Sequence, residues 1–294
     1  LLPVLIEAGH QIVACTREKS RFQVLESWEG KLEVLEVDFL EDPISDLFPK
    51  DIDIAYYLVH SMSASIGDVE EKEKTSAENF KTYSNKTQAK QIIYLTGIIN
   101  SKEELSPHLQ SRLNVENILG TCEAPLTALR AGIIVGSGSA SFEIIRDLVE
   151  KLPIMITPKW LNSKCQVIAI RNVIQYLTGI ILHEECLGKS FDISSGEVFT
   201  YKEMLLGYAK CRKLKRYIFT VPIMTPRLSS YWLFFVTSTS YPLAVNLVNS
   251  MKINVVGKEN KLRETLGIKN IKYIEAVKMA FQKIEQNMVV SSWK

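Results

Sequence analysis

A threonine, a histidine and an arginine are spaced so that they could act on one bound molecule. Thr96 ends the apolar run 91–96, while His108 and Arg112 stand four residues apart in a predicted helix and therefore share a face. An imidazole titrates near pH ~6.5 and can give or take a proton. A guanidinium keeps its proton and can hold hydroxyl groups, and a threonine hydroxyl can donate a hydrogen bond. Side chains of these types can therefore transfer a proton and hold a bound molecule.

The same residues also fit a helix start without chemistry. Ser106 and Pro107 are typical of the capping position and the first position of a helix, so His108 lies near the helix N-terminus. The positive end of the helix dipole disfavours the imidazolium form there. The alternative interpretation is a polar helix start at which no proton is transferred.

Apolar runs typical of strands alternate with helical patterns through the first half of the chain. The predicted strands are 11–16, 31–37, 52–59, 91–96 and 125–130. The predicted helices between them are 19–27, 68–86 and 107–119. Strands separated by helices form βαβ units with right-handed crossovers. The sequence therefore predicts an α/β fold with a Rossmann-like, doubly wound parallel sheet.

The second half of the chain is less regular. Its predicted helices are 142–152, 171–183, 201–213 and 272–286, and its predicted strands are 166–170 and 189–193. Five prolines interrupt this part of the sequence, which is typical of irregular connections. We divide the chain into residues 1–140, which carry the first sheet, and 141–294, a mixed segment with late sheet strands and a smaller helical lobe.

Composition excludes several classes of partner. The net charge is only +2, so no nucleic-acid partner is expected. The five cysteines contain no CxxC pair, which favours reduced thiols in a cytoplasmic protein and predicts no metal site. The uncharged run 231–248 is about as long as a membrane span, but Pro242 and several polar residues favour two buried helices with no membrane contact. The expected partner is a small-molecule substrate of unknown identity, and a homodimer is compatible with the sequence.

Seven stretches, in their order and spacing, resemble atypical short-chain dehydrogenases/reductases related to NmrA-like and nucleoside-diphosphate-sugar epimerase-like proteins. They are 8–17, 37–39, 55–62, 78–80, 93–97, 105–112 and 129–142. The resemblance implies an NAD(P)-binding domain in residues 1–140 and a substrate lobe in 141–294. It also implies an NADP-dependent oxidoreductase or epimerase-like activity. The alternative is an NmrA-like sensor that holds the dinucleotide without turnover.

The choice of cofactor rests on the end of the second strand of such a fold. An acid at that point binds the 2′-hydroxyl of NAD, whereas an arginine accommodates the 2′-phosphate of NADP. Thr16 and Arg17 occupy it here, so the resemblance implies NADP, with NAD as the second choice. The alternative for Arg17 is a solvated residue at a strand end.

Asp38 resembles the position that meets the adenine amino group, although a turn cap before Leu40 explains it nearly as well. The full cofactor set that the resemblance implies is Thr16, Arg17, Asp38, Phe39, Leu58, Val59, His60, Gly97, Arg112, Ala131, Gly132 and Ile133.

Other features could shape a substrate cleft. The glycine- and serine-rich loop 136–141 follows a strand, and the pair 159–160 and Gln166 could line a pocket in the second lobe. Tyr56 and Tyr57 are adjacent in one predicted strand. Because neighbours in a strand face opposite sides, one of the two tyrosines could face the cleft.

The sequence departs from the family pattern in two places. The family uses a serine with a Tyr-x-x-x-Lys pair, and Thr96, His108 and Arg112 stand in those positions. The resemblance therefore implies that these three residues form the candidate catalytic set. The chain also opens on a helical pattern that ends at Gly9, without the usual opening strand and glycine-rich turn. We therefore expect it to be part of a longer protein whose opening strand lies between strands 11–16 and 52–59. Cofactor binding is expected of that longer protein.

Overall fold

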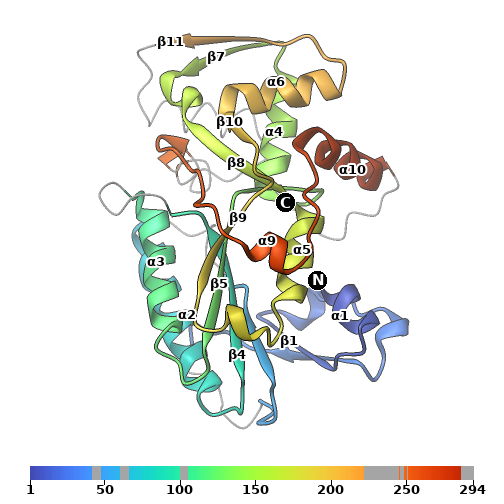
Figure 1. The fold of residues 1–294 in the computed structure, drawn as a ribbon, viewed down its shortest axis with the longest axis vertical. Helices are drawn as coiled ribbons and strands as arrows, with labels where there is room; N and C mark the ends of the chain where they lie inside the picture. The colour runs from blue at the N-terminus through green and yellow to red at the C-terminus, as the bar shows by residue number, and fades with distance from the viewer. Residues whose placement is uncertain are drawn as a thin grey trace.

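The computed structural model describes residues 1–41, 48–59, 66–99, 105–221, 245, 248–249 and 251–285 (Figure 1). Its central sheet has four parallel strands in the order β3–β4–β5–β9. These strands are β3 (Ile54–Tyr57), β4 (Gln91–Gly97), β5 (Leu126–Ala131) and β9 (Ser190–Ile193). The two inner strands carry continuous apolar runs, in which Ile92, Ile93 and Leu129 are fully buried. Such runs are typical of a parallel sheet that is covered on both faces.

Helices cover both faces of this sheet. Helices α2 (Ile66–Ser84) and α3 (Pro107–Leu119) pack on one face, and α5 (Ile170–Gly179) packs on the other (Figure 1). Helix α3 begins where the sequence predicts, because the Ser106 side chain accepts a hydrogen bond from the Leu109 N–H at 3.3 Å.

The adjacent tyrosines of β3 are both used in the core. The Tyr57 ring packs edge-on against Phe80, whereas the Tyr56 hydroxyl on the opposite face donates to the Leu177 carbonyl at 2.8 Å. Because both faces of the sheet are covered, the expectation that one of these tyrosines faces a ligand cleft is wrong.

A separate two-stranded parallel sheet carries the start of the chain. It pairs β1 (Ile12–Thr16) with β2 (Leu32–Glu36), and no described residue of either strand pairs with β3. Helix α1 (Leu2–Glu7) precedes it and is followed by Gly9 at φ +88°, a left-handed conformation that glycine adopts without strain. The expectation that a further strand belongs beside β1 stays a prediction.

The predicted helix 19–27 is wrong. The segment instead forms two short 3₁₀ turns, η1 (Lys19–Arg21) and η2 (Glu26–Trp28), separated by extended backbone at Phe22 and Leu25. Most of its described side chains are exposed. Short helices are marginal unless an apolar face packs against the protein, and this segment buries too little apolar surface to select one.

The remaining elements form a second unit, which Figure 1 shows above the central sheet. Its main sheet has the order β10–β8–β6, and a second sheet pairs β7 with β11 in parallel. The strands are β6 (Ile133–Val135), β7 (Ile154–Pro158), β8 (Lys164–Ala169), β10 (Val198–Thr200) and β11 (Tyr217–Val221). The helical elements are α4 (Ala140–Lys151), η4 (Lys159–Asn162), α6 (Tyr201–Cys211) and α10 (Tyr273–Glu285), while η5 (Glu184–Cys186) and α9 (Leu262–Thr265) are short connections. We call β6, β7, β8, β10, β11, α4, η4, α6 and α10 the upper unit.

The chain passes between the two units more than once. Strand β6 belongs to the upper unit, whereas α5 and β9 return to the central sheet. Residues 141–294 therefore supply β9, a late strand of the central sheet, and also most of the upper unit. The boundary at residue 140 stays a prediction.

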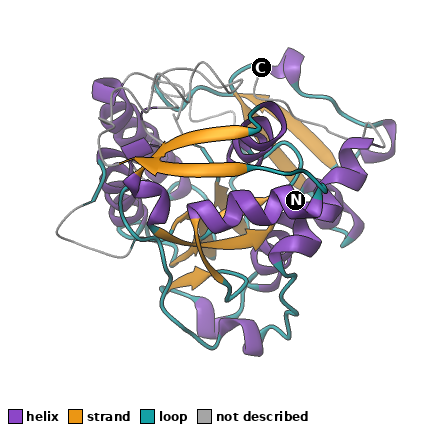
Figure 2. Ribbon diagram, turned by 90° about the horizontal axis from the view of Figure 1, so that it is seen from above, coloured by secondary structure: helices purple, strands orange, loops and turns teal. Residues whose placement is uncertain are grey.

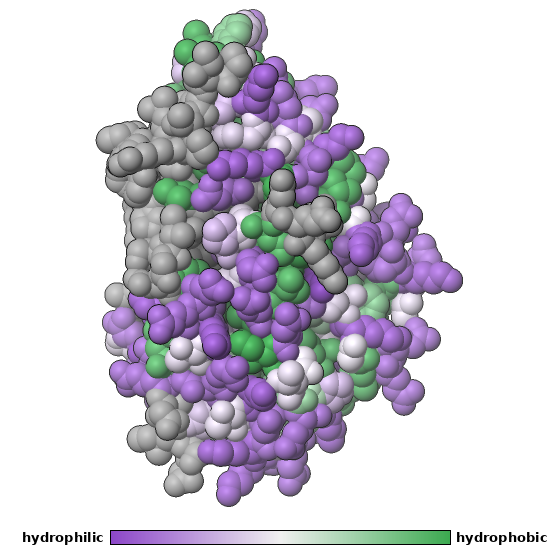
Figure 3. Space-filling view, turned by 90° about the vertical axis from the view of Figure 1, so that its left-hand side faces the viewer, coloured by the Kyte–Doolittle hydropathy of each residue, from purple (hydrophilic) through white to green (hydrophobic). Residues whose placement is uncertain are grey.

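The outer end of the upper unit exposes apolar side chains. Seen from above (Figure 2), the paired strands β7 and β11 lie nearest the viewer. Ile154, Ile156, Tyr217 and Phe219 alternate along these strands, and each is more than half exposed. Figure 3 shows apolar atoms at this end and a largely hydrophilic surface over the lower half. Within the described ranges, no helix is both long and apolar enough to cross a bilayer. The predicted helix pair in 231–248 lies almost wholly outside those ranges.

A buried glutamine ties the amino ends of β4 and β5 to the turn after α5. The Gln91 side-chain amide donates to the Thr127 hydroxyl at 2.8 Å and to the Ile180 carbonyl at 3.0 Å. Its oxygen accepts from the Leu182 N–H at 2.7 Å. Leu182 has a φ of +50°, which is unusual for this residue type, so the hydrogen bond fixes a strained turn.

We predict that Gln91→Met lowers the free energy of unfolding by about 3 kcal/mol, because each buried polar group left without a partner costs ~1–3 kcal/mol. Urea denaturation followed by circular dichroism measures the change. The control is Gln110→Met, since Gln110 is exposed and bonds only Asn114 in the described structure. Its expected effect is below ~0.5 kcal/mol. Equal losses for the two variants would contradict this role of Gln91.

Candidate functional site

A cavity of about 610 Å³ lies where the carboxyl ends of β4 and β5 meet the upper unit. Ligands of open α/β sheets bind beyond the carboxyl ends of the strands, and pockets for small molecules commonly enclose ~300–1,000 Å³. The cavity therefore has the position and size of a ligand site.

Eight of the residues predicted from the sequence line this cavity. They are Leu58, Thr96, Gly97, His108, Arg112, Ala131, Gly132 and Ile133. They come from the ends of β3, β4 and β5, the start of α3 and the start of β6. The fold thus brings the candidate catalytic set to one place, although what each residue does there stays a prediction.

Arg112 is a buried cation beside the cavity. Only 7% of the residue is exposed, and its Nε has no hydrogen-bond partner. No carboxylate of the described residues forms an ion pair with it. The Glu73 carboxylate of α2 instead accepts a hydrogen bond from the hydroxyl of the neighbouring Ser111, at 2.5 Å. A buried guanidinium is costly unless its donors are satisfied, so Arg112 can bind a polar or anionic ligand group.

Thr96 and His108 also hold unused hydrogen-bonding atoms. Thr96 is 4% exposed, and its Oγ1 makes no hydrogen bond of normal geometry although Tyr94 lies close by. The Nδ1 of His108 is buried without a partner as well. Buried polar atoms are nearly always paired in folded proteins, so their concentration at one cavity is typical of a binding site.

Burial, and secondly the Arg112 charge, lower the pKa of His108 to about 3. The imidazole is therefore neutral at neutral pH and offers one N–H donor and one acceptor nitrogen. The sequence predicts a disfavoured imidazolium from the helix dipole, and the structure adds burial and the Arg112 charge as causes. A group with so low a pKa is a weak base near pH ~7.

Five predicted cofactor residues do not line the cavity, and His60 lies outside the described residues. Thr16 bonds the Glu18 carbonyl at 3.4 Å, and Arg17 is exposed at the end of β1. Val59 is also exposed. These residues are left on other parts of the carboxyl edge.

Asp38 and Phe39 have structural contacts of their own. The Asp38 carboxylate accepts from the Leu40 N–H at 2.9 Å, which is the turn cap that the sequence allows as the alternative. The Phe39 ring is buried among aromatic rings that include Phe80 and Tyr83. It belongs to the core, and the Phe39 carbonyl accepts from the Asn79 amide at 2.8 Å.

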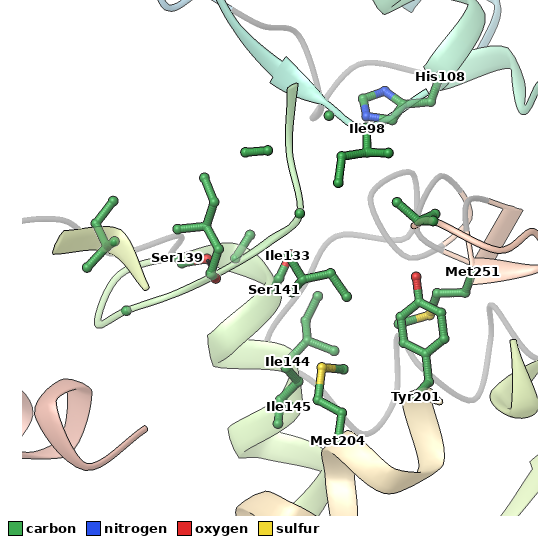
Figure 4. A pocket seen from close by; sticks show the side chains of 18 of the residues that line it. Ile98, His108, Ile133, Ser139, Ser141, Ile144, Ile145, Tyr201, Met204 and Met251 are labelled. Carbon is green, nitrogen blue, oxygen red and sulfur yellow. Dashed lines mark hydrogen bonds between the residues drawn. The ribbon is translucent and has the colours of Figure 1, made fainter. Parts of the chain in front are cut away.

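The upper wall of the cavity was only partly foreseen from the sequence. The loop 136–141 and Trp160 line it as predicted, whereas Lys159 is exposed and Gln166 instead accepts from the Gly257 N–H at 2.8 Å. The sequence missed further lining side chains from α4, α6 and the chain near α6 (Figure 4), namely Ile144, Ile145, Leu148, Tyr201, Met204, Leu205 and Met251. All but Met251 lie in helices that the sequence predicts, where they read as ordinary apolar positions, and no local signal marks any of them as lining a cavity.

Solved structures share this fold. An epimerase from Methanothermobacter thermautotrophicus aligns with a TM-score of 0.74 over 98% of this chain and 89% of its own, at 12% identity. A nucleoside-diphosphate-sugar epimerase from Staphylococcus aureus gives 0.70 over 90% and 89%, at 13% identity. MoeE5 in complex with UDP-glucose and NAD gives 0.71 over 98% and 94%, at 12% identity.

No family model matches the chain, and no curated protein matches it in sequence. At these identities the solved structures show the fold alone. The predicted Rossmann-like α/β fold, with a smaller second lobe, is thereby confirmed. The chain has the fold of nucleoside-diphosphate-sugar epimerase-like proteins, as the resemblance in its sequence implies.

We predict that Arg112→Gln raises the pKa of His108, because the guanidinium charge is one of the two causes that lower it. The pKa stays below ~6.5, since burial is the larger cause and persists. Nitrogen-15 NMR of the imidazole across acidic and neutral pH measures the shift. The control is Arg171→Gln at an exposed position, which should leave the pKa unchanged. An unchanged pKa in Arg112→Gln would show that the two side chains are uncoupled.

The lowered pKa also sets the sign of the pH dependence of stability. Because the folded-state pKa of His108 lies below the unfolded value of ~6.5, protons bind the unfolded chain more tightly. The contribution of His108 to the free energy of unfolding is therefore fully present above that pH and declines as the pH falls toward about 3.

Proposed function

We propose that this chain is an NAD(P)-dependent oxidoreductase or epimerase-like enzyme that acts on a small molecule. The main support for this proposal is the cavity at the carboxyl edge of the sheet. Thr96, His108 and Arg112 all line it, and each has a buried polar atom without a hydrogen-bond partner. MoeE5, which shares the fold, was solved with NAD, and this supports a nicotinamide dinucleotide here.

The buried polar atoms fit the nicotinamide end of such a cofactor. Arg112 stands where related enzymes have the lysine that holds the nicotinamide ribose, and its donors can bind ribose hydroxyls. The cofactor, when bound, supplies or accepts the hydride. Gly97 and Gly132 line the cavity at the strand ends, where the backbone of an open α/β sheet meets its ligand.

We assign His108 the role of a hydrogen-bond donor to a substrate carbonyl. A neutral imidazole with a depressed pKa can polarise a carbonyl without carrying a charge itself. Thr96 can donate a second hydrogen bond at the same edge. Proton transfer then depends on how far a bound substrate changes the environment of the ring.

Arg17 supports NADP as the preferred cofactor. Its side chain is exposed at the end of β1, so its guanidinium is available to pair with a 2′-phosphate.

All five cysteines are free thiols, which supports the cytoplasm as the compartment.

A dinucleotide sensor without turnover is the second candidate function. The pKa of about 3 at His108 favours it, because proton transfer is most efficient when the pKa of the acid or base lies near the working pH.

Calorimetric titration with NADPH and NADH tests the cofactor assignment. The samples are this chain and the longest natural product that contains it. We expect NADPH to bind more tightly, and Arg17→Gln to weaken NADPH by roughly tenfold while NADH changes little, since an ion pair with phosphate is lost. Arg171→Gln is the matched control. Equal affinities for the two cofactors in the wild type would remove the case for NADP.

Oxidation of NADPH across a panel of carbonyl compounds tests turnover. We predict that His108→Ala lowers kcat by ~10²–10⁴-fold, the usual loss when a positioned proton-transfer or polarising group is removed. His183→Ala is the control, because His183 also has a buried, unpartnered Nδ1 but does not line the cavity. NADPH binding without oxidation of any compound would favour the sensor.

A further inference from the structure

We infer that the upper part of the cavity binds a largely apolar molecule with a single carbonyl or hydroxyl group, and not a nucleotide sugar. This inference rests on the proposed function, since it names the substrate class for the same site. It concerns the part of the cavity that the upper unit forms. The candidate catalytic residues lie on the other side, which belongs to the central sheet.

The walls of this part are apolar. Helix α4 contributes Ile144, Ile145 and Leu148, and α6 contributes Met204 and Leu205. In Figure 4 the side chains of Ile144, Ile145 and Met204 gather on one side of the cavity, with Ile133 above them and Met251 across from them. An apolar ligand gains ~25 cal/mol for each Å² of apolar surface that it buries against such walls.

Charged groups are scarce in the lining. Among the described lining residues, Arg112 is the only one with a charged side chain, since His108 is neutral. Arg112 stands on α3, on the side of the cavity that belongs to the central sheet. A diphosphate is recognised by several cationic or N–H donors together, and desolvating it without them is costly.

The N-terminus of α4 does not supply that anion site. Glu143, in the first turn of this helix, accepts from the Gly138 N–H at 3.3 Å and forms an ion pair with Arg146. A carboxylate therefore already complements the positive end of the helix. The Ser139 hydroxyl is also used, because it donates to the Ile134 carbonyl at 2.8 Å.

Few unused polar side chains remain in the upper wall, and they suit a neutral ligand oxygen. Besides the hydroxyls of Ser137 and Ser141 in the loop 136–141, they are a phenol and an indole. The Tyr201 hydroxyl points into the cavity in Figure 4, and burial raises the pKa of this phenol, so it stays a neutral donor. The indole Nε1 of Trp160 is buried without a partner. One carbonyl or hydroxyl group on an otherwise apolar ligand satisfies such donors, whereas a sugar would leave most of its hydroxyl groups facing apolar walls.

Calorimetric titration with named probes tests the ligand class. The apolar probes are 1-tetralone, β-ionone and 2-decanone, which differ in shape but each carry one carbonyl group, and the contrasting probe is UDP-glucose. Each is titrated into the chain with and without NADPH. We expect at least one apolar probe to bind and UDP-glucose to bind at least roughly tenfold more weakly.

Two variants locate the binding. Ile133→Asp and Met251→Lys place a charge on the wall at half-buried positions, where the side chain can partly reach water. Each should weaken the apolar probe at least roughly tenfold, because a charge beside an apolar ligand must be desolvated. The matched control is Val198→Asp, which introduces a charge at a residue that is 46% exposed and does not line the cavity. Circular dichroism confirms that each variant is folded.

The outcomes separate this inference from the proposed function. Failure of all three apolar probes, tighter binding of UDP-glucose, or equal effects of the wall variants and the control would overturn the inference. NADPH binding in those samples would leave the proposed function intact. Binding of an apolar probe that the wall variants weaken supports the inference, and if NADPH fails to bind in the same samples, only the proposed function is contradicted.

Discussion

The close approach of two backbones at Gly132 determines how the two units meet. This residue is the single link between β5 of the central sheet and β6 of the upper unit, and its N–H donates to the Ile193 carbonyl of β9 at 3.0 Å. A methyl group at Gly132 would lie 2.5 Å from the Gln166 carbonyl oxygen of β8, so only glycine fits between the sheets. Because the strands separate at this residue, the cavity opens beside it.

The same crossing explains which predictions about the fold succeed. The apolar runs of β4 and β5 and the capped start of α3 are local patterns that identify a parallel sheet and its helices. The segment 19–27 misleads, because its local pattern suits a helix while most of its described side chains are exposed and bury little apolar surface. Tyr56 and Tyr57 mislead in the opposite way, since alternation gives their directions but does not reveal that helices cover both faces.

The same distinction separates the residues of the candidate site that could be predicted from those that could not. Thr96, His108 and Arg112 were found because they stand at family positions that the resemblance marks, and the spacing of four residues adds that His108 and Arg112 share a helix face. Tyr201 and Met204 were missed because they reach the cavity only through the packing of α6 on α4 in the upper unit. Asp38 shows the limit of the resemblance, because its carboxylate already caps a turn in this chain.

The two halves of the cavity place different demands on a ligand. On the central-sheet side, a buried arginine and two further unpartnered polar atoms need a polar group to complete their hydrogen bonds. On the upper side, burying the same polar group against isoleucine, leucine and methionine side chains would cost free energy, because they offer it no hydrogen bond. A single molecule that meets both demands must be polar at one end and apolar at the other. With the proposed function, a nicotinamide ribose beside Arg112 and an apolar substrate beyond it would divide those demands between two ligands, with His108 at the boundary. The neutral state of His108 suits that boundary, because an imidazolium there would face Arg112 on one side and apolar walls on the other.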